Sequence, residues 1–221
     1  MSASSPDSAP LSAGLSIHAD PGAARADDVR QLRGNLGVGV RLVSGGTGFV
    51  FMSFLFAFFY LRAVNSNGLW RPRHVTPVQS WGIVVLVATI LCAVVFDSAR
   101  RHVVAGTEPA WRRGSLLALA LGILVVVAQG LEYATITFRT ADGGWASVFW
   151  GWTLVQLVFW LGAVYWIETL VAQSLRQLPA SARLGTGGSE LLAPSASACQ
   201  VYLYTMTAIA FVSYVLLYLV K

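Results

Sequence analysis

One carboxylate, Glu132, lies near the end of one of the most apolar stretches of this 221-residue chain. Residues 114–131 before it are all uncharged, and the next charged residue is Arg139. An ionisable group in such a run usually faces the protein interior and has a function. The stretch Gln-Gly-Leu-Glu-Tyr therefore holds the candidate site, which comprises Gln129, Glu132 and Tyr133. We favour a proton-linked or interhelical role over a solvated position at a helix end.

A buried carboxylate either pairs with a donor or is protonated, because an unpaired charge at depth costs several kcal/mol. The donors expected for Glu132 are Tyr133, the tryptophans of the segment that follows, and Arg139. Two other acidic residues have plainer interpretations. Glu168 is expected to be a surface carboxylate, and Asp97, beside Arg100 and Arg101, to mark the end of a helix.

The sequence predicts that this chain binds no haem, copper or other metal by itself. Membrane haem and copper centres need ligands at depth, usually imidazole, and all three histidines lie in polar segments: His18, His74 and His102. Cys92 and Cys199 form no metal-binding motif. We find no catalytic residues either, since the sequence holds neither a phosphate-binding glycine loop nor a nucleophile beside a base.

The composition is that of a membrane protein. Of all residues 56% are hydrophobic and only 11% are charged, whereas a soluble domain carries about 25% charged residues. The net charge of +5 comes from arginines at the ends of apolar runs, which suits anchoring at lipid headgroups and not nucleic-acid binding. The abundance of Ala, Gly, Val and Arg is typical of a bacterial gene.

The predicted fold is an all-α integral membrane protein with a bundle of five transmembrane helices. Each expected span has about the 20 residues that a helix needs to cross a bilayer; the spans are residues 42–62, 76–96, 114–138, 146–173 and 199–220. Residues 1–33 are expected to be a disordered cytoplasmic arm before a membrane domain of residues 34–221. Residues 177–198, rich in Gly, Ser, Ala and Pro, are expected to be a flexible connector.

Basic residues predict a cytoplasmic N-terminus and an external C-terminus, because cytoplasmic loops are enriched in Arg and Lys. With this orientation nine basic residues lie inside and five outside. Those inside are Arg25, Arg30, Arg33, Arg100, Arg101, Arg112, Arg113, Arg176 and Arg183, and those outside are Arg62, Arg71, Arg73, Arg139 and Lys221.

Four stretches together resemble subunit III of the haem–copper oxidases, in the short five-helix form that lacks the first two helices of the longer form. They are Phe-Leu-Phe-Ala-Phe-Phe-Tyr-Leu-Arg at 54–62, Gln-Gly-Leu-Glu-Tyr at 129–133, Trp-Ala-Ser-Val-Phe-Trp-Gly-Trp-Thr at 145–153, and Val-Tyr at 201–202 followed by Leu-Leu-Tyr-Leu at 216–219. The resemblance covers residues 36–220, and residues 129–133 are its most specific part.

The chain departs from this family at several polar positions. The family's membrane carboxylate falls on Thr47, and two of its histidines fall on Gln156 and Phe159. The polar residues of the family's last helix fall on Leu203, Tyr204, Thr205 and Thr207. Glu132 is the carboxylate of the family pattern that is retained.

The resemblance implies a non-catalytic subunit III of a bacterial terminal oxidase in aerobic respiration, in the cell inner membrane. Such a subunit packs on the catalytic subunit I, beside subunit II, binds phospholipid and supports proton uptake and stability. It implies that haem and copper belong to the partner subunits, with cytochrome c as electron donor and no nucleic acid as partner.

Two alternatives remain open at the level of sequence. The chain could serve a quinol oxidase or a nitric oxide reductase as an accessory protein of the same kind. It could also be a small proton-coupled transporter that uses Glu132, although no internal repeat or pair of broken helices accompanies that residue.

Overall fold

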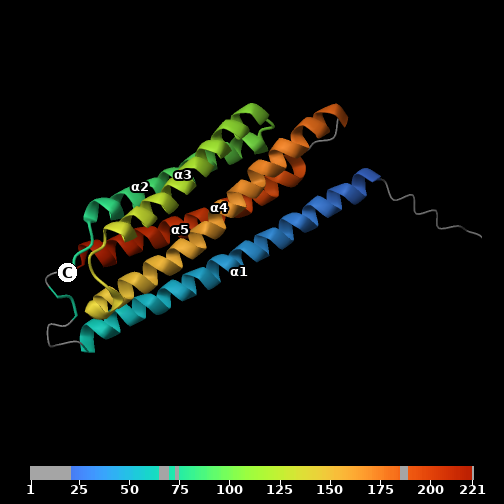
Figure 1. The fold of residues 1–221 in the computed structure, drawn as a ribbon. Coiled ribbons are helices and arrows are strands. Elements are labelled where there is room, and N and C mark those ends of the chain that lie inside the picture. The colour runs from blue at the N-terminus through green and yellow to red at the C-terminus, as the bar shows by residue number, and fades with distance from the viewer. Residues whose placement is uncertain (1–20, 65–69, 73–74, 185–188, 221) are drawn as a thin grey trace, which may run out of the picture.

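The computed structural model describes residues 21–64, 70–72, 75–184 and 189–220, and these are helical almost throughout (Figure 1). Five α-helices follow one another as α1 (Pro21–Val64), α2 (Gln79–Val104), α3 (Glu108–Thr135), α4 (Gly144–Leu184) and α5 (Ser189–Tyr214). A short 3-10 helix, η1 (Thr140–Asp142), precedes α4, and a π-helix, η2 (Val215–Leu219), continues α5. The described residues contain no strand, as the all-α prediction requires.

All five helices contain a segment long and apolar enough to cross a membrane. The segments are Arg30–Val64, Gln79–Val104, Glu108–Thr135, Gly144–Arg176 and Leu192–Leu219. At 1.5 Å per residue, a segment of about 20 residues spans the roughly 30 Å hydrocarbon core. The prediction of a five-helix, multi-pass membrane protein is therefore confirmed.

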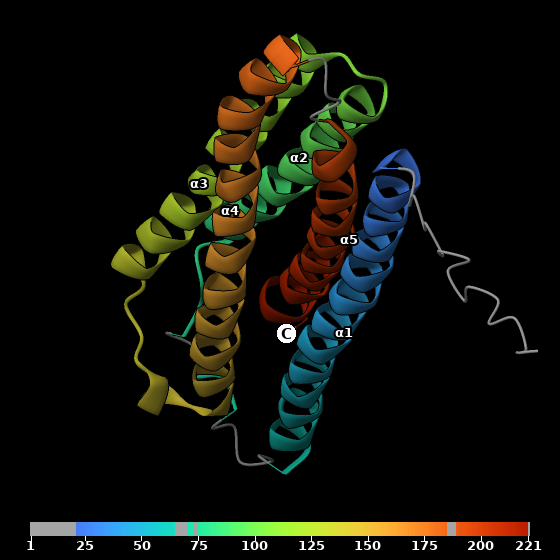
Figure 2. The ribbon, with the colours of Figure 1, turned by 90° about the vertical axis from the view of Figure 1, so that its right-hand side faces the viewer.

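Helices α2 and α3 form an antiparallel hairpin, and α5 lies centrally, in contact with α1, α2 and α4 (Figure 2). The hairpin turn contains Gly106, whose φ of 76° is in the left-handed region that favours glycine. A second glycine brings the helices close together, since a Cβ at Gly114 would lie 2.8 Å from the Ala99 Cβ. Both features allow tight packing of α2 on α3.

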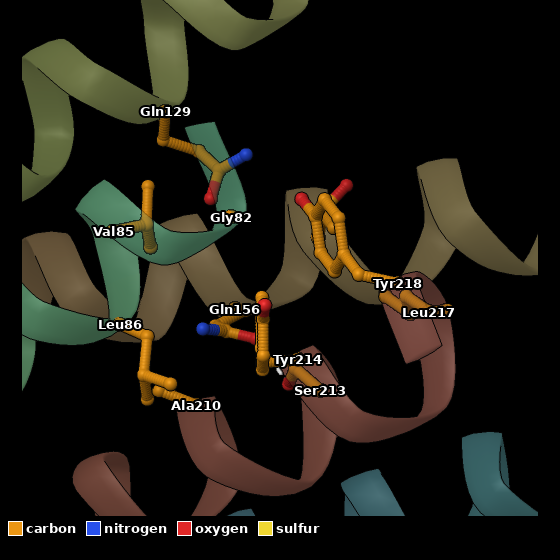
Figure 3. Close-up of a pocket in the computed structure, with 11 residues that line it drawn as sticks. Gly82, Val85, Leu86, Gln129, Gln156, Ala210, Ser213, Tyr214, Leu217 and Tyr218 are labelled. Atoms are coloured by element: carbon orange, nitrogen blue, oxygen red, sulfur yellow. Dashed lines mark hydrogen bonds between the residues drawn. The ribbon is translucent and has the colours of Figure 1, made fainter. Parts of the chain in front are cut away.

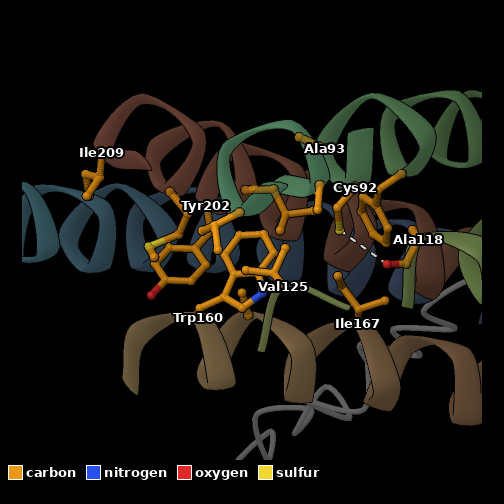
Figure 4. Packing of buried hydrophobic residues seen from close by; sticks show 14 of the residues in the cluster. Cys92, Ala93, Ala118, Val125, Trp160, Ile167, Tyr202 and Ile209 are labelled. Atoms are coloured by element: carbon orange, nitrogen blue, oxygen red, sulfur yellow. Dashed lines mark hydrogen bonds between the residues drawn. The ribbon is translucent and has the colours of Figure 1, made fainter. Parts of the chain in front are cut away.

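The middle of the bundle is packed with small and aromatic side chains (Figure 4). On α4, Trp160 donates its Nε1 hydrogen to the Gly122 carbonyl of α3 at 3.0 Å. The Cys92 thiol of α2 donates to the Ala118 carbonyl at 3.2 Å, and both Cys92 and Cys199 are buried free cysteines. These bonds satisfy polar groups that would otherwise be stranded in an apolar interior.

The predicted disordered arm is wrong for residues 21–33, which are the first turns of α1. Extending an existing helix is much easier than nucleating one, so the long apolar span that follows supports these polar turns. An exposed ion pair between Arg30 and Asp27, at 3.7 Å, bridges one turn there. The rest of the predicted arm, residues 1–20, lies outside the described residues.

The predicted flexible connector at 177–198 is also wrong for most of its length. Helix α4 continues to Leu184 and α5 begins at Ser189, although Pro194 lies inside it. Packing explains the helix, because Leu192 and Ala196 are buried in the core and tertiary contacts outweigh local propensity. Residues 185–188 lie outside the described part of the chain.

Candidate functional site

Glu132 lies on the buried side of α3, three residues before that helix ends. The buried residues of this helix recur every three or four positions, which places them on one face; they include Ser115, Ala118, Gly122, Val125, Gln129 and Glu132. The helix begins with Pro109 in its first turn and ends where Ile136 turns extended. This periodicity directs Glu132 into the bundle, where its exposed fraction is 0%.

Both oxygen atoms of the Glu132 carboxyl group have a hydrogen-bond partner. Gln129, one turn earlier on α3, donates its Nε2 hydrogen to Oε2 at 2.6 Å. Tyr218, in η2, donates its hydroxyl hydrogen to Oε1. The carboxyl group is thus satisfied by two uncharged side chains, and one of them joins α3 to the end of the last helix.

The donors expected from the sequence are not the ones that the structure brings to Glu132. Tyr133 points to another side of α3, where its ring stacks on Trp150 of α4 at 5.1 Å. Arg139 is exposed and its backbone N–H bonds Asp142, and Trp150 and Trp152 donate to Phe138 and Ser213. Gln129 and Glu132 are therefore brought together, and Tyr133 contributes packing instead.

Two local features allow Tyr218 to reach Glu132. The π-helix η2 has one more residue per hydrogen-bonded turn than an α-helix, so it changes the direction in which residues 215–219 point. Gly82 of α2 provides the space, because a Cβ there would lie 2.6 Å from the Tyr218 ring. The Tyr218 ring also stacks on Tyr214 at 5.5 Å and meets the edge of Phe149 at 6.0 Å.

The aromatic packing continues from the site to the end of the bundle. Phe149 stacks on Trp145 at 5.1 Å, and the Arg71 guanidinium lies 4.4 Å from the centre of the Trp145 ring. Partial burial lowers the pKa of Arg71, and a cation placed over an aromatic face is stabilised by the ring quadrupole. The segment before α2 is also held by a hydrogen bond from the backbone N–H of Trp145 to the backbone carbonyl of Trp70, at 2.9 Å.

A second polar network lies beside the first and was not predicted. Trp152 of α4 donates to the Ser213 hydroxyl of α5 at 2.6 Å, and Ser213 in turn lies 2.6 Å from the Gln156 Oε1. All three residues are buried. The only signal in the sequence is a pair of polar residues, Gln156 and Ser213, within apolar spans, because their spacing does not show that they meet.

The two networks line opposite sides of a small cavity between α2, α3, α4 and α5 (Figure 3). Its volume is about 20 Å³, which is room for one water molecule. Apolar side chains form part of the wall, and polar ones form the rest: Gln129, Thr153, Gln156, Ser213, Tyr214 and Tyr218.

Two other acidic residues for which the sequence makes a prediction lie away from this site. Glu168 on α4 is exposed, as expected of a surface carboxylate. Asp97 on α2 bonds Arg100 at 2.8 Å and Arg101 at 2.6 Å. Helix α2 continues past it to Val104, so Asp97 does not mark the helix end that the sequence predicts.

Two of the positions that depart from the family pattern have local or apolar roles, whereas Gln156 belongs to the second polar network. Thr47 is buried on α1 and donates its hydroxyl hydrogen to the Val43 carbonyl of the same helix, at 2.8 Å. Phe159 packs against Phe51 with ring centres 6.0 Å apart. In the described residues there is no group of three or more His, Cys, Asp or Glu side chains that could hold a metal ion.

Residues 23–179 match the family described as cytochrome c oxidase subunit III. The chain belongs to this family. Relatives named cytochrome c oxidase subunit 3 are similar to it at low identity. The protein of Ornithorhynchus anatinus is 24% identical over 145 residues, which are 62% of this chain and 55% of the relative.

Two further relatives with the same name match comparable stretches. That of Latimeria chalumnae is 25% identical over 57% of this chain and 51% of its own length. That of Podospora anserina is 27% identical over 52% of this chain and 44% of its own length. The chain thus spans about half the length of the curated relatives it matches. Gln129, Glu132 and Tyr133 lie within the matched region.

Proposed function

We propose that this chain is a non-catalytic subunit III of a bacterial terminal haem–copper oxidase in aerobic respiration, located in the cell inner membrane. The observation that carries the proposal is the family match over residues 23–179. Five apolar helices long enough to cross a membrane support the location in a bilayer. The electron donor in this proposal is cytochrome c.

In this role the chain packs on the catalytic subunit and holds lipid, while haem and copper stay in partner subunits. Helix α1 offers a large apolar surface for these contacts, because many of its aromatic and long side chains are exposed: Phe49, Met52, Phe56, Phe59 and Tyr60. In a bilayer such a surface faces lipid or another membrane subunit.

Glu132 has a structural role in this proposal. Its carboxyl group accepts from Gln129 on its own helix and from Tyr218 at the end of the chain, so it ties α3 to η2 inside the bundle. A rigid bundle presents a constant surface to the catalytic subunit, which is how an accessory subunit supports proton uptake and turnover stability.

Co-purification of the tagged full chain in mild detergent tests the function. We expect haem-bearing partners with an oxidase spectrum and cytochrome c oxidase activity. Quinol oxidase or nitric oxide reductase activity in the purified complex would show that the partner enzyme is of that kind and is not a cytochrome c oxidase. A chain that purifies alone and transports protons in vesicles would overturn the proposal.

Substitution of Glu132 tests its structural role within that complex. Glu132→Gln keeps the shape and hydrogen-bonding capacity of the side chain, so we expect assembly and oxidase turnover to be retained. Glu168→Gln, on the exposed face of α4, is the matched control. Loss of proton-coupled activity in Glu132→Gln with assembly intact would place the carboxyl group in a proton path instead.

The absence of bound metal is tested by spectroscopy of the chain purified without partners. The sequence predicts no imidazole within the spans, but the apolar segment of α2, Gln79–Val104, includes His102. His102 lies in the last turn of α2, where it is exposed and bonded to Thr107. We expect neither haem absorption nor stoichiometric copper. A haem b spectrum that stays with the isolated chain would contradict this.

The orientation is proposed to be N-terminus inside and C-terminus outside, from the distribution of basic residues. Cysteines placed at Ala3 and Lys221, with Cys92 and Cys199 changed to serine, can be labelled by a membrane-impermeant reagent. In intact cells we expect labelling at position 221 alone. Equal labelling of both positions from one side would mean an even number of spans.

A further inference from the structure

Two buried glutamine side chains face each other across the cavity described above. Gln129 of α3 is 5% exposed and Gln156 of α4 is 8% exposed. A side-chain amide has an acceptor oxygen and a donor nitrogen, and both need partners when they are buried. Here each amide uses only one end in bonds to the described residues.

The orientation of Gln129 follows from its partner. The Glu132 carboxyl oxygen accepts the bond, so the Gln129 nitrogen must face it, and the Gln129 oxygen is left over. The Ser213 hydroxyl lies 2.6 Å from the Gln156 oxygen and 2.6 Å from the Ile209 carbonyl, and it donates its one hydrogen to one of them. When it donates to Gln156, the Gln156 nitrogen is left over. Figure 3 shows the Gln129 oxygen turned toward Gly82 and the Gln156 nitrogen turned toward the α2 side, away from Tyr218.

The size of the cavity limits what it can hold. A water molecule needs about 10–15 Å³ and two to four polar partners, and the cavity has a volume of about 20 Å³ with polar side chains from three helices. An organic ligand is too large for it. A metal ion lacks ligands, because both carboxyl oxygens of Glu132 are engaged by Gln129 and Tyr218.

We propose that this cavity is a binding site for one water molecule that bridges the Gln129 oxygen of α3 and the Gln156 amide of α4. Water accepts from the Gln156 nitrogen and donates to the Gln129 oxygen. Because water is both donor and acceptor, it also satisfies the reversed Gln156 amide, in which the nitrogen faces Ser213.

The water molecule connects two hydrogen-bond networks that are not linked by direct bonds between side chains. One contains Tyr218, Glu132 and Gln129, and the other contains Gln156, Ser213 and Trp152. A continuous set of hydrogen bonds then joins α3, α4, α5 and η2. A buried water that satisfies such amides is part of the folded structure.

An experimental map of the full chain in its native complex tests the site directly. At a resolution that shows ordered water, we expect a density peak about 3 Å from both the Gln129 oxygen and the Gln156 amide. A map that shows other buried waters but no peak in this cavity overturns the proposal. So does a direct bond between the two amides.

A double-mutant cycle gives an independent test by thermal unfolding in mild detergent. Gln129→Leu and Gln156→Leu each lower Tm, and each strands the water and the other amide. The double variant should therefore lose about 2–4 °C less than the sum of the single losses. Additive losses overturn the bridge.

Gln200 provides the matched control for the cycle. It is a buried glutamine on α5 whose nitrogen donates to the Ala93 carbonyl at 3.2 Å, and it does not line the cavity. Gln129→Leu combined with Gln200→Leu should be additive. If the Gln129 and Gln200 pair is as strongly coupled as the Gln129 and Gln156 pair, the coupling measures a general loosening of the bundle. The cycle would then no longer support a water bridge.

Discussion

The two buried carboxyl groups of the α2–α3 hairpin are satisfied in opposite ways. Asp97, near the turn between the helices, bonds two arginines through separate oxygens. Glu132, at the other end of the hairpin, is fully buried and bonds the uncharged Gln129 and Tyr218. In the sequence Asp97 has two arginines three and four residues later, whereas Glu132 has no basic residue before Arg139.

The difference follows from the distance to water. Arg101 stays 75% exposed while it contacts Asp97, because a long side chain can keep its charge hydrated and still reach a carboxylate below the surface. Inside the bundle an arginine would itself have to be desolvated, which costs several kcal/mol. Uncharged donors are therefore the less costly partners for Glu132.

The largest effect is expected at Tyr218, which supplies both a bond and a large buried ring. Tyr218→Ala should lower the free energy of unfolding by about 3–5 kcal/mol, as for other buried aromatic truncations. Tyr218→Phe should cost about 1–3 kcal/mol, since it removes only the donor to Glu132. Thermal unfolding in detergent measures both. No loss in Tyr218→Phe would show that the hydroxyl contributes nothing beyond the ring.

Glu132→Leu is expected to cost about 2–4 kcal/mol, because it strands the Tyr218 hydroxyl and the Gln129 amide in the interior. Glu132→Gln should cost less than about 1 kcal/mol, since an amide can bond both neighbours. The same unfolding measurement applies. A loss in Glu132→Gln as large as in Glu132→Leu would mean that the carboxylate charge itself is needed.

Gly82→Ala tests the space that admits Tyr218. The added Cβ would lie 2.6 Å from the Tyr218 ring, so the ring must move and its bond to Glu132 must weaken, at a cost of about 1–3 kcal/mol. Gly130→Ala on α3 is the control, because nothing lies within 4 Å of its Cβ position. If Gly82→Ala is as stable as the unchanged chain, the Tyr218 ring does not lie against Gly82.

The smallest effect is expected at Asp97. Asp97→Asn keeps the shape and should cost less than about 1 kcal/mol, because its arginine partners are partly hydrated. High salt should reduce this difference, since ions screen exposed charges, but it should not change the cost of Glu132→Leu. If salt does not change the cost of Asp97→Asn, the ion pairs of Asp97 are as inaccessible to water as the Glu132 site.

Only part of the candidate site can be predicted from sequence patterns. The chemistry of Glu132 among apolar residues indicates an interior carboxyl group, and Gln129, one helical turn away, follows from helix periodicity. Tyr218 is 86 residues away from Glu132, and nothing local marks it as the partner. The same holds for Gln156 and Ser213, 57 residues apart.

The sequence by itself determined the five spans, because a bilayer of fixed thickness requires about 20 apolar residues in each helix. It also placed Glu132 inside one of them. The lengths of the helices beyond the membrane were not determined in this way, since α1 and α4 continue into polar segments where packing and helix cooperativity decide. Which side chains meet was decided only in the tertiary structure. The π-turn of η2 and the close approach at Gly82 together bring Tyr218 to Glu132, and both depend on the packing of the whole bundle.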